Sequence, residues 1–237
     1  MIWMVRCGRL LLAGLLVLGV QSAGAQTLLL SESFDGEAQY TANLFSDSLN
    51  DYFTVSDGSG PLDPSGFDPY ASITPQDGSA MLQAEDTNSP DNPLGSGENG
   101  YLIFDSQDVS AYDRVEVRLY LAADQGDFDD DDFLYLEYAF DDDSASAGSA
   151  NVNTGTYTRL AAFIGPASLS GNLQEDTDLN GTQDGTVLSA TWQQFSYIFD
   201  VTGTSASVRL QVHCDSTEEI AVDTVRIYGL SNSGRQQ

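Results

Sequence analysis

The feature that most constrains this chain is a period-two alternation of apolar side chains, which is clearest in its last long segment. Residues 218–229 read EEIAVDTVRIYG, and Ala221, Asp223, Val225 and Ile227 share one parity. Alternate side chains of a strand point to one face, so we expect these four residues to face the core. A carboxylate buried there loses several kcal/mol of hydration unless a cation or a set of donors replaces the water. Asp223 is therefore a candidate site residue.

The same alternation recurs in the second half of the chain, and no segment keeps a helical period over three turns. Several segments carry one apolar and one polar face, with turn residues between them. This pattern is typical of antiparallel sheets that close into a sandwich or jelly roll. We predict an all-β, antiparallel two-sheet sandwich (jelly roll) with about nine or ten strands. The segments are 101–104, 114–121, 133–140, 157–164, 192–201, 207–214 and 218–229.

The first 25 residues have the layout of a cleavable secretory signal. Arg6 and Arg9 precede an apolar run at 10–20, and small residues follow at 23–25. The run spans about 11 residues, against the roughly 20 that cross a bilayer, although a retained N-terminal anchor is an alternative. We expect cleavage near Ala25 and a secreted, extracellular or periplasmic protein. Residues 26–237 then form one β-sandwich domain, with long loops at about 36–100 and 165–190.

The charge balance excludes some partners. The sequence has 36 acidic residues and 8 basic ones, all arginine, and its formal net charge is −28. Such a surface repels nucleic-acid phosphates and anionic membranes, so we expect no nucleic-acid partner and no membrane insertion after signal cleavage. The acidity suits adaptation to salt or a capacity for divalent cations. Only Cys214 remains beyond the signal, so no disulfide is expected within the mature chain, and we interpret Cys214 as a small buried hydrophobic residue.

A second carboxylate occupies an apolar parity near the start of the chain. In the segment 27–34, TLLLSESF, Leu28, Leu30, Glu32 and Phe34 share one side of the expected strand. Glu32 thus faces the same difficulty as Asp223. One cation held by both would explain the two positions together.

The loop at 176–184, DTDLNGTQD, matches the oxygen-ligand pattern DxDxNGxxD. Alternate side chains of such a loop converge on one cation, and Gly181 allows the sharp turn, which suits Ca²⁺. Val187 stands where an EF-hand requires a bidentate Glu, so a full EF-hand is rejected. An ordinary Asn-Gly turn with solvated acids is the alternative. The candidate ligands are Asp176, Asp178, Asn180 and Asp184.

A polar and aromatic set on two expected strands is a weaker candidate for ligand binding. Arg118 and Tyr120 share the outward parity of one strand, and Tyr135 and Glu137 share that of the next. If the two strands are neighbours, the four side chains lie together, and such a set can bind a sugar by ring stacking and hydrogen bonds to hydroxyls. The alternative is a solvated face with a cross-strand pair between Arg118 and Glu137.

Signatures of an enzyme are scarce. The sequence has no GxSxG, no HExxH, no phosphate-binding glycine loop and no Cys/His zinc spacing, and its one histidine, His213, is interpreted as a surface residue. We assign no catalytic residue. Two alternatives to a binding module stay open. One is an extracellular polysaccharide hydrolase or lyase, because a carboxylate pair is easily found in so acidic a chain. The other is a structural matrix protein of a salt-adapted bacterium.

Both ends of the chain resemble a known group of extracellular modules. Glu32, Phe34 and Asp35 near the start, with IAVDTVRI near the end, are similar to jelly-roll modules such as MAM domains and carbohydrate-binding modules of galactose-binding-like or concanavalin-like type. The resemblance implies that the first and last strands are adjacent. It also implies that Glu32 and Asp223, with Asp35 as a further candidate, hold a structural Ca²⁺. A calcium-stabilised, non-catalytic module that binds an extracellular glycan or a cell-surface or matrix partner is the expected function.

Overall fold

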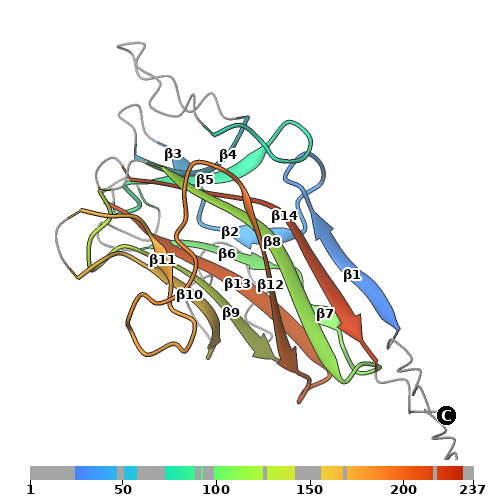
Figure 1. Cartoon of the computed structure of the whole chain (residues 1–237). Coiled ribbons are helices and arrows are strands. Elements are labelled where there is room, and N and C mark those ends of the chain that lie inside the picture. Colours follow the sequence, from blue (N-terminus) through green and yellow to red (C-terminus); the bar gives the residue numbers. More distant parts are fainter. Residues whose placement is uncertain are drawn as a thin grey trace, which may run out of the picture.

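The chain folds into two antiparallel sheets packed face to face, as the computed structural model in Figure 1 shows. The described residues contain no helix, which confirms the predicted all-β sandwich. Within them, accordingly, no helix has the length and apolar character needed to cross a membrane. The structure describes residues 25–46, 51–57, 73–88, 92, 99–124, 127–141, 156–167, 170–215 and 218–231.

Sheet A has seven strands within the described ranges. Its order is β12, β8, β14, β5, β4, β3, and β1 pairs with β14 on the same edge as β5. Gln26 pairs with Leu230 and Glu32 with Val225, so the predicted adjacency of the first and last strands is confirmed (Figure 1, blue beside red). The strands are β1 (Gln26–Glu32), β3 (Phe45–Ser46), β4 (Tyr52–Ser56), β5 (Met81–Glu85), β8 (Arg114–Asp124), β12 (Gln193–Asp200) and β14 (Glu219–Leu230).

Sheet B also has seven strands in the part of the chain that is described. Its order is β11, β10, β9, β13, β6, β2, and β7 pairs with β13. Four of the fourteen strands have only two or three residues, which is why the alternation pattern does not reveal them. The strands are β2 (Tyr40–Ala42), β6 (Gly100–Phe104), β7 (Gln107–Asp108), β9 (Phe133–Phe140), β10 (Thr158–Ile164), β11 (Gln174–Glu175) and β13 (Ser205–His213).

The core lies between the sheets and follows the predicted alternation. On β8, Val117, Leu119 and Leu121 are buried in the main cluster, and β9 and β13 contribute their own alternate residues, among them Leu134 and Leu210. The opposite parity of each strand faces outward. Cys214 extends the apolar parity of β13 and is fully buried, as predicted.

Two parity predictions are wrong, because β1 and β14 each contain a register shift. In β1 the shift lies between Leu28 and Leu30, and Leu28 is exposed rather than inward. In β14 the shift is a β-bulge. The ladder with β8 shifts register between Asp223 and Arg226, and Thr224 has a positive φ of 48°. A bulge inserts one residue and exchanges the faces that follow it. Val225 therefore joins the core between the sheets, whereas Ala221 packs in a separate cluster on the outer face of sheet A. Asp223 shares that outer face, where it is nevertheless fully buried.

The expected long loops contain more structure than the sequence indicates. The 36–100 stretch carries four short strands, β2 to β5, rather than two or three, and β11 lies within 165–190. Four parts of 36–100, namely 47–50, 58–72, 89–91 and 93–98, lie outside the described residues. The predicted signal at 1–25 also lies outside them, except for Ala25.

Candidate functional site

The four residues expected to form one sugar-binding set lie on two different sheets. Strand β8 pairs with β12 and β14, whereas β9 pairs with β10 and β13. The condition that the strands are neighbours is therefore not met. Arg118 and Tyr120 face outward from sheet A, and Tyr135 and Glu137 face outward from sheet B. The predicted alternative, a pair between Arg118 and Glu137, is also wrong: Arg118 bonds Glu116 at 2.7 Å.

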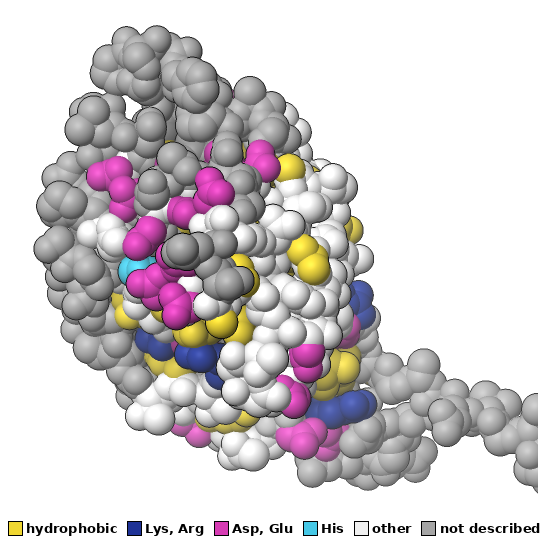
Figure 2. Space-filling view, turned by 60° about the vertical axis from the view of Figure 1, so that its left-hand side comes forward, with side chains coloured by type: hydrophobic (Ala, Val, Ile, Leu, Met, Phe, Trp, Pro, Cys, Tyr) yellow, Lys and Arg dark blue, Asp and Glu magenta, His cyan; other side chains and the backbone are white. Residues whose placement is uncertain are grey.

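Sheet B presents a continuous outer face of aromatic and charged side chains, which we call the β9–β13 face. Its members have the parity opposite to the core residues of β6, β9, β10 and β13. Figure 2 shows acidic side chains (magenta) gathered around the histidine (cyan), with arginine (blue) and hydrophobic (yellow) side chains below them. The face consists of Tyr101, Phe133, Tyr135, Glu137, Tyr157, Arg159, Arg209, Gln211 and His213.

Glu137 is the centre of this face because it binds two arginines. Its Oε2 accepts hydrogen bonds from Arg209 Nε at 3.0 Å and from Arg209 Nη2 at 2.6 Å. Its Oε1 lies 3.5 Å from Arg159 Nη2. The Glu137 and Arg209 side chains are 7% and 9% exposed, while that of Arg159 is 39% exposed. One carboxylate thus holds a buried guanidinium and a solvent-facing one.

The aromatic rings fix both arginines. The Arg159 guanidinium lies 3.2 Å from the centroid of the Tyr135 ring, and Phe133 stacks on Tyr135 with centroids 3.9 Å apart. His213 follows at 5.7 Å from Phe133. Arg159, Tyr135, Phe133 and His213 therefore form a column in which Arg159 and Phe133 both contact the Tyr135 ring. Contacts of this kind add stabilisation beyond burial and limit the mobility of the guanidinium.

The inner part of the β9–β13 face is held by Tyr101 and Tyr157. Arg209 lies 4.0 Å from the centroid of Tyr157 and 5.2 Å from that of Tyr101. The hydroxyl of Tyr101 accepts hydrogen bonds from Asn99 Nδ2 at 3.1 Å and Gln211 Nε2 at 3.3 Å. These contacts come from β6, β13 and the segment before β10, so several chain segments build one rigid surface.

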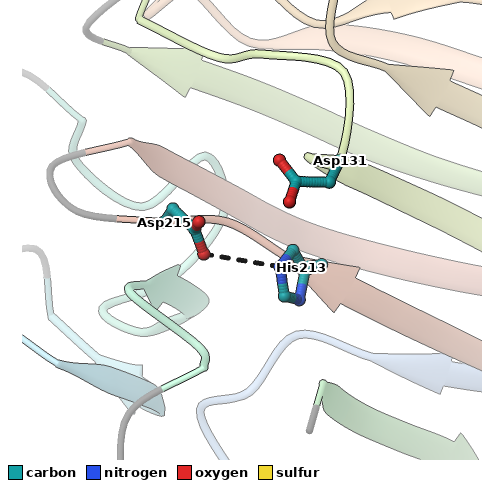
Figure 3. A group of neighbouring side chains, drawn as sticks. All are labelled: Asp131, His213 and Asp215. Atoms are coloured by element: carbon teal, nitrogen blue, oxygen red, sulfur yellow. Dashed lines mark ion pairs between the residues drawn. The ribbon is translucent and has the colours of Figure 1, made fainter. Parts of the chain in front are cut away.

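A group of titratable side chains lies at the end of this face. Ligand atoms of Asp131, His213 and Asp215 lie within 4.8 Å of one another (Figure 3). His213 Nε2 is 3.4 Å from Asp215 Oδ1, and His213 Nδ1 is 2.8 Å from Asn99 Oδ1. Imidazole and carboxylate oxygens in this arrangement are able to bind a divalent cation or to exchange protons. The sequence interpretation of His213 as a surface residue misses this group, since Asp131 and Asp215 are far from each other in the chain.

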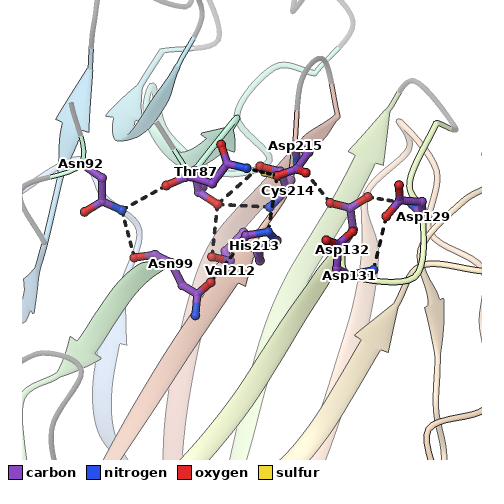
Figure 4. Close-up of polar contacts among 11 residues, drawn as sticks. Thr87, Asn92, Asn99, Asp129, Asp131, Asp132, Val212, His213, Cys214 and Asp215 are labelled. Atoms are coloured by element: carbon purple, nitrogen blue, oxygen red, sulfur yellow. Dashed lines mark hydrogen bonds and ion pairs between the residues drawn. The ribbon is translucent and has the colours of Figure 1, made fainter. Parts of the chain in front are cut away.

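The neighbouring acids form a connected polar network (Figure 4). Asp132, almost fully buried, accepts hydrogen bonds from the backbone N–H of Asp129 at 2.7 Å and of Asp215 at 3.1 Å. Burial, only partly offset by the Asp129 N–H, raises the pKa of Asp132 to about 7. A hydrogen bond between Asp129 and Asp131 lowers the pKa of Asp129 and raises that of Asp131. Asp132 is therefore the carboxyl of this network that we expect to titrate near neutral pH.

The predicted calcium ligands Glu32 and Asp223 both accept hydrogen bonds from backbone N–H groups. Glu32 Oε1 accepts from the N–H of Phe34 at 2.6 Å, and its Oε2 accepts from Gln39 at 2.9 Å. Asp223 Oδ2 accepts from the N–H of Gln76 at 2.8 Å and of Asp77 at 3.1 Å. Burial nonetheless raises the pKa of Asp223, and these backbone donors oppose the shift.

The bulge sets these two carboxylates on opposite faces of sheet A. Glu32 pairs with Val225, which faces the core, whereas Asp223 lies on the outer face beneath the 73–80 segment. Asp35 is exposed and accepts hydrogen bonds from the N–H of Ser79 at 2.6 Å and from its hydroxyl at 2.8 Å. These bonds lower the pKa of Asp35. Glu32 and Asp223 thus lie on paired strands but on opposite faces at the junction of β1 and β14, and calcium binding by Glu32, Asp35 and Asp223 stays a prediction.

The loop at 176–184 is closed by its own hydrogen bonds. Asp176 accepts from the N–H of Asn180 at 3.1 Å and of Gly181 at 2.7 Å, and Asp184 accepts from Thr177 N and Oγ1, both at 2.8 Å. The bonds from Thr177 lower the pKa of Asp184. In the described part of the chain, two groups of three acidic or histidine residues have ligand atoms within 4.8 Å of one another. Neither group lies in this loop. One compact turn holds all four predicted ligands: Asp176, Asp178, Asn180 and Asp184.

The sequence pattern predicts that Tyr135 and Glu137 share an outward face, but it does not predict their partners. Arg209 and Arg159 come from strands paired to β9 on either side, and no spacing in the sequence reveals that pairing. A usable signal was present on β13, where Arg209, Gln211 and His213 form an outward row of functional side chains.

No protein-family profile matches this sequence, and no curated protein matches it. Among solved structures, it is similar to the K2 cleaved adhesin domain of Lys-gingipain, with 15% identity, coverage of 86% of this chain and 97% of the other, and a TM-score of 0.44. It is also similar to the CBM22-1 xylan-binding domain of Paenibacillus barcinonensis Xyn10C, with 13% identity, coverage of 90% and 100%, and a TM-score of 0.44. With scores below 0.5, neither likeness assigns a function.

Proposed function

We propose that this chain is a secreted, non-catalytic β-sandwich module that binds an extracellular glycan, or a glycan-bearing surface or matrix partner, through the β9–β13 face. The observation that supports it is the double use of Glu137, which holds Arg209 inside the face and Arg159 at its surface. A guanidinium fixed before binding loses little entropy when it meets its ligand. Preorganised polar groups around an apolar platform are typical of small-ligand sites.

The geometry favours polar recognition over ring stacking. Phe133 and Arg159 both contact the Tyr135 ring, so a sugar cannot displace them without breaking the column. The side chain of Arg159 is 39% exposed and still has N–H groups directed to solvent. A planar guanidinium pairs well with two adjacent hydroxyls or with a carboxylate. We therefore expect sugars with vicinal hydroxyls or a uronic acid to bind best.

Calcium is the second part of the proposal. The sequence predicts two candidate ligand groups, the loop at 176–184, with Asp176, Asp178, Asn180 and Asp184, and the junction with Glu32, Asp35 and Asp223. Because the Asp223 carboxylate already accepts two backbone N–H groups, the ion of this proposal is assigned to the loop, and the junction serves as the comparison. Their oxygen donors suit Ca²⁺, and an ion that binds only the folded chain raises its stability. Melting of the protein in calcium and in EDTA, with Asp184→Asn and Asp223→Asn for comparison, separates the two groups.

A binding panel tests the glycan proposal. The protein is titrated with neutral and uronic-acid polysaccharides by calorimetry and affinity electrophoresis. Arg159→Ala should reduce affinity for a bound polysaccharide at least tenfold. Arg118→Ala is the matched control, because Arg118 is also held by a glutamate, Glu116, and also lies over a tyrosine ring, that of Tyr228, but on sheet A.

Three outcomes of that panel bear on the proposal. Equal loss in the two arginine variants would contradict the assignment to the β9–β13 face. The absence of any binding across the panel would contradict glycan binding itself. Reducing ends or unsaturated products released from a polysaccharide would establish the hydrolase or lyase alternative instead.

A further inference from the structure

Three carboxylates form a row across one end of sheet A. Glu85 ends β5, Glu219 begins β14, and Asp124 ends β8 (Figure 1). Glu219 pairs directly with Asp124, and the pairing of Ile220 with Ala84 sets Glu219 beside Glu85. Residues opposite each other in an antiparallel ladder have Cβ atoms about 5 Å apart and point to the same face. The row therefore lies on the outer face of sheet A, the face that carries Asp223.

Glu85 is the unusual member of this row. It is completely buried, and neither of its carboxylate oxygens has a hydrogen-bond partner. Glu218, which precedes β14, is 5% exposed, and its Oε2 also has no partner. Six buried carboxylates elsewhere in the described chain accept hydrogen bonds from backbone N–H groups or side chains: Glu32, Glu116, Asp132, Glu137, Asp176 and Asp223.

Among the described residues, the charged groups that act most strongly on Glu85 are acidic. After burial, the groups that raise its pKa to about 9 are Glu219, Asp86, Asp51 and Glu218. The ion pairs of the described arginines go elsewhere, to Glu116, Glu137 and Asp77. A buried carboxylate with neither donors nor a counter-charge either keeps a proton or takes a cation.

The arrangement favours a cation over a proton. A proton neutralises one carboxylate, whereas a divalent ion between Glu85 and Glu219 removes the repulsion between them and reduces that of Glu218. Carboxylate oxygens are the ligands that Ca²⁺ prefers, and backbone carbonyls and water complete its shell. Asp124 is half-buried and gives the row an end that is open to solvent. Two independent features therefore coincide: aligned acids, and a fully buried carboxylate without partners.

We propose that Glu85 and Glu219 bind a calcium ion at this end of sheet A. The site is distinct from the loop at 176–184 and from the junction around Asp223, and it does not depend on glycan binding. The ion would link the end of β5 to the start of β14, where the chain re-enters the sheet. Its role is to fix that end of the sandwich.

Calcium titration of the full chain after EDTA treatment tests the site. Calorimetry gives the number of ions bound, and thermal melts give the stabilisation. Glu85→Gln and Glu219→Gln keep the side-chain shape but remove charge, and each should lose one bound ion per chain and part of the calcium-induced rise in Tm. Glu37→Gln, at an exposed position, should bind like the wild type. Asp184→Asn should keep this ion even if it loses another.

Retention of the wild-type stoichiometry and affinity in Glu85→Gln and Glu219→Gln would overturn the site. A wild-type chain that binds no calcium would also overturn it, and the row would then be held by protons. If Glu85→Gln does not fold, as judged by circular dichroism, Glu219→Gln decides. Glycan binding is measured in a separate experiment. Failure of the proposed function would therefore appear in the polysaccharide titrations, and failure of this site would appear in the calcium titrations.

Discussion

Asp223 and Glu85 are both fully buried carboxylates on the outer face of sheet A, yet their surroundings are opposite. Asp223 accepts two backbone N–H donors from the 76–77 turn and one from Thr224. Glu85 accepts none, and its neighbours are acids. Burial alone therefore does not indicate a metal. What separates the two is whether the covering segment offers amide donors, and only the unsatisfied carboxylate calls for an external cation.

The largest loss of stability is expected when a buried carboxylate that accepts hydrogen bonds loses its donors and so becomes like Glu85. Arg209→Ala removes both strong donors of Glu137 and leaves a buried charge with only the more distant Arg159. Breaking one side of a buried pair costs roughly 3 to 5 kcal/mol, so we expect a loss of about 3 kcal/mol in unfolding free energy. Urea denaturation measures it. A loss below about 1 kcal/mol would mean that Glu137 is neutral or solvated.

Asp223→Ala should cost nearly as much, and equally with and without calcium. The substitution removes the acceptor of the Gln76 and Asp77 N–H groups, and each lost hydrogen bond costs about 1 kcal/mol. We expect a loss of about 2 kcal/mol by urea denaturation, with Glu37→Ala as the exposed control. A loss that appears only in calcium would instead place the predicted ion at Asp223.

The pH dependence of stability separates the two carboxylates further. Burial and acidic neighbours raise the pKa of Glu85 to about 9 in the folded chain, so between its ordinary value and pH 9 the folded state binds a proton that the unfolded state does not. Without calcium, the contribution of Glu85 to the unfolding free energy should therefore be fully present below about pH 4.5. It should be lost as pH rises towards 9, by up to about 1.4 kcal/mol per pH unit. Glu85→Gln should flatten that decline. An equal slope in the variant would contradict the assignment.

The smallest effect concerns the bulge that sets Asp223 on the outer face. Thr224 has a positive φ, which glycine adopts without strain, but its hydroxyl is 3.0 Å from Gln76 Oε1. Thr224→Gly relieves about 1 kcal/mol of backbone strain but loses one hydrogen bond, and the two effects nearly cancel. Its unfolding free energy should therefore stay within about 1 kcal/mol of the wild-type value. Thr54→Gly, inside β4, should lose about 1 kcal/mol in the same melts. A large loss at Thr224 would show that the hydroxyl contact dominates.

The sequence predicts the class of fold, because alternation and turn residues are local signals. The pairing of the end strands is implied by the resemblance to jelly-roll modules and is confirmed. It also predicts that Glu32 faces inward. It does not predict the bulge at Thr224, which needs only one extra residue and reverses the face of Asp223. Nor does it predict the burial of Glu85, since MLQAE reads as an ordinary strand whose polar parity faces water.

The candidate site shows the same limit. Glu137 and Tyr135 follow from the parity of one strand, and the prediction of an outward pair was right for these two. Their partners depend on which strands lie beside β9, and this is decided by the packing of the whole sandwich. Arg118 was predicted to lie beside Glu137 on the condition that their strands are neighbours, but β8 and β9 belong to different sheets.

The most direct test of the contrast between Glu85 and Asp223 is crystallographic. Crystals grown in calcium, with anomalous data collected at a long wavelength, would locate any ion without reference to the melts. We expect an anomalous peak between the carboxylates of Glu85 and Glu219, and none at Asp223 Oδ2, which already accepts two N–H groups. A peak at Asp223 with none at Glu85 would contradict the account.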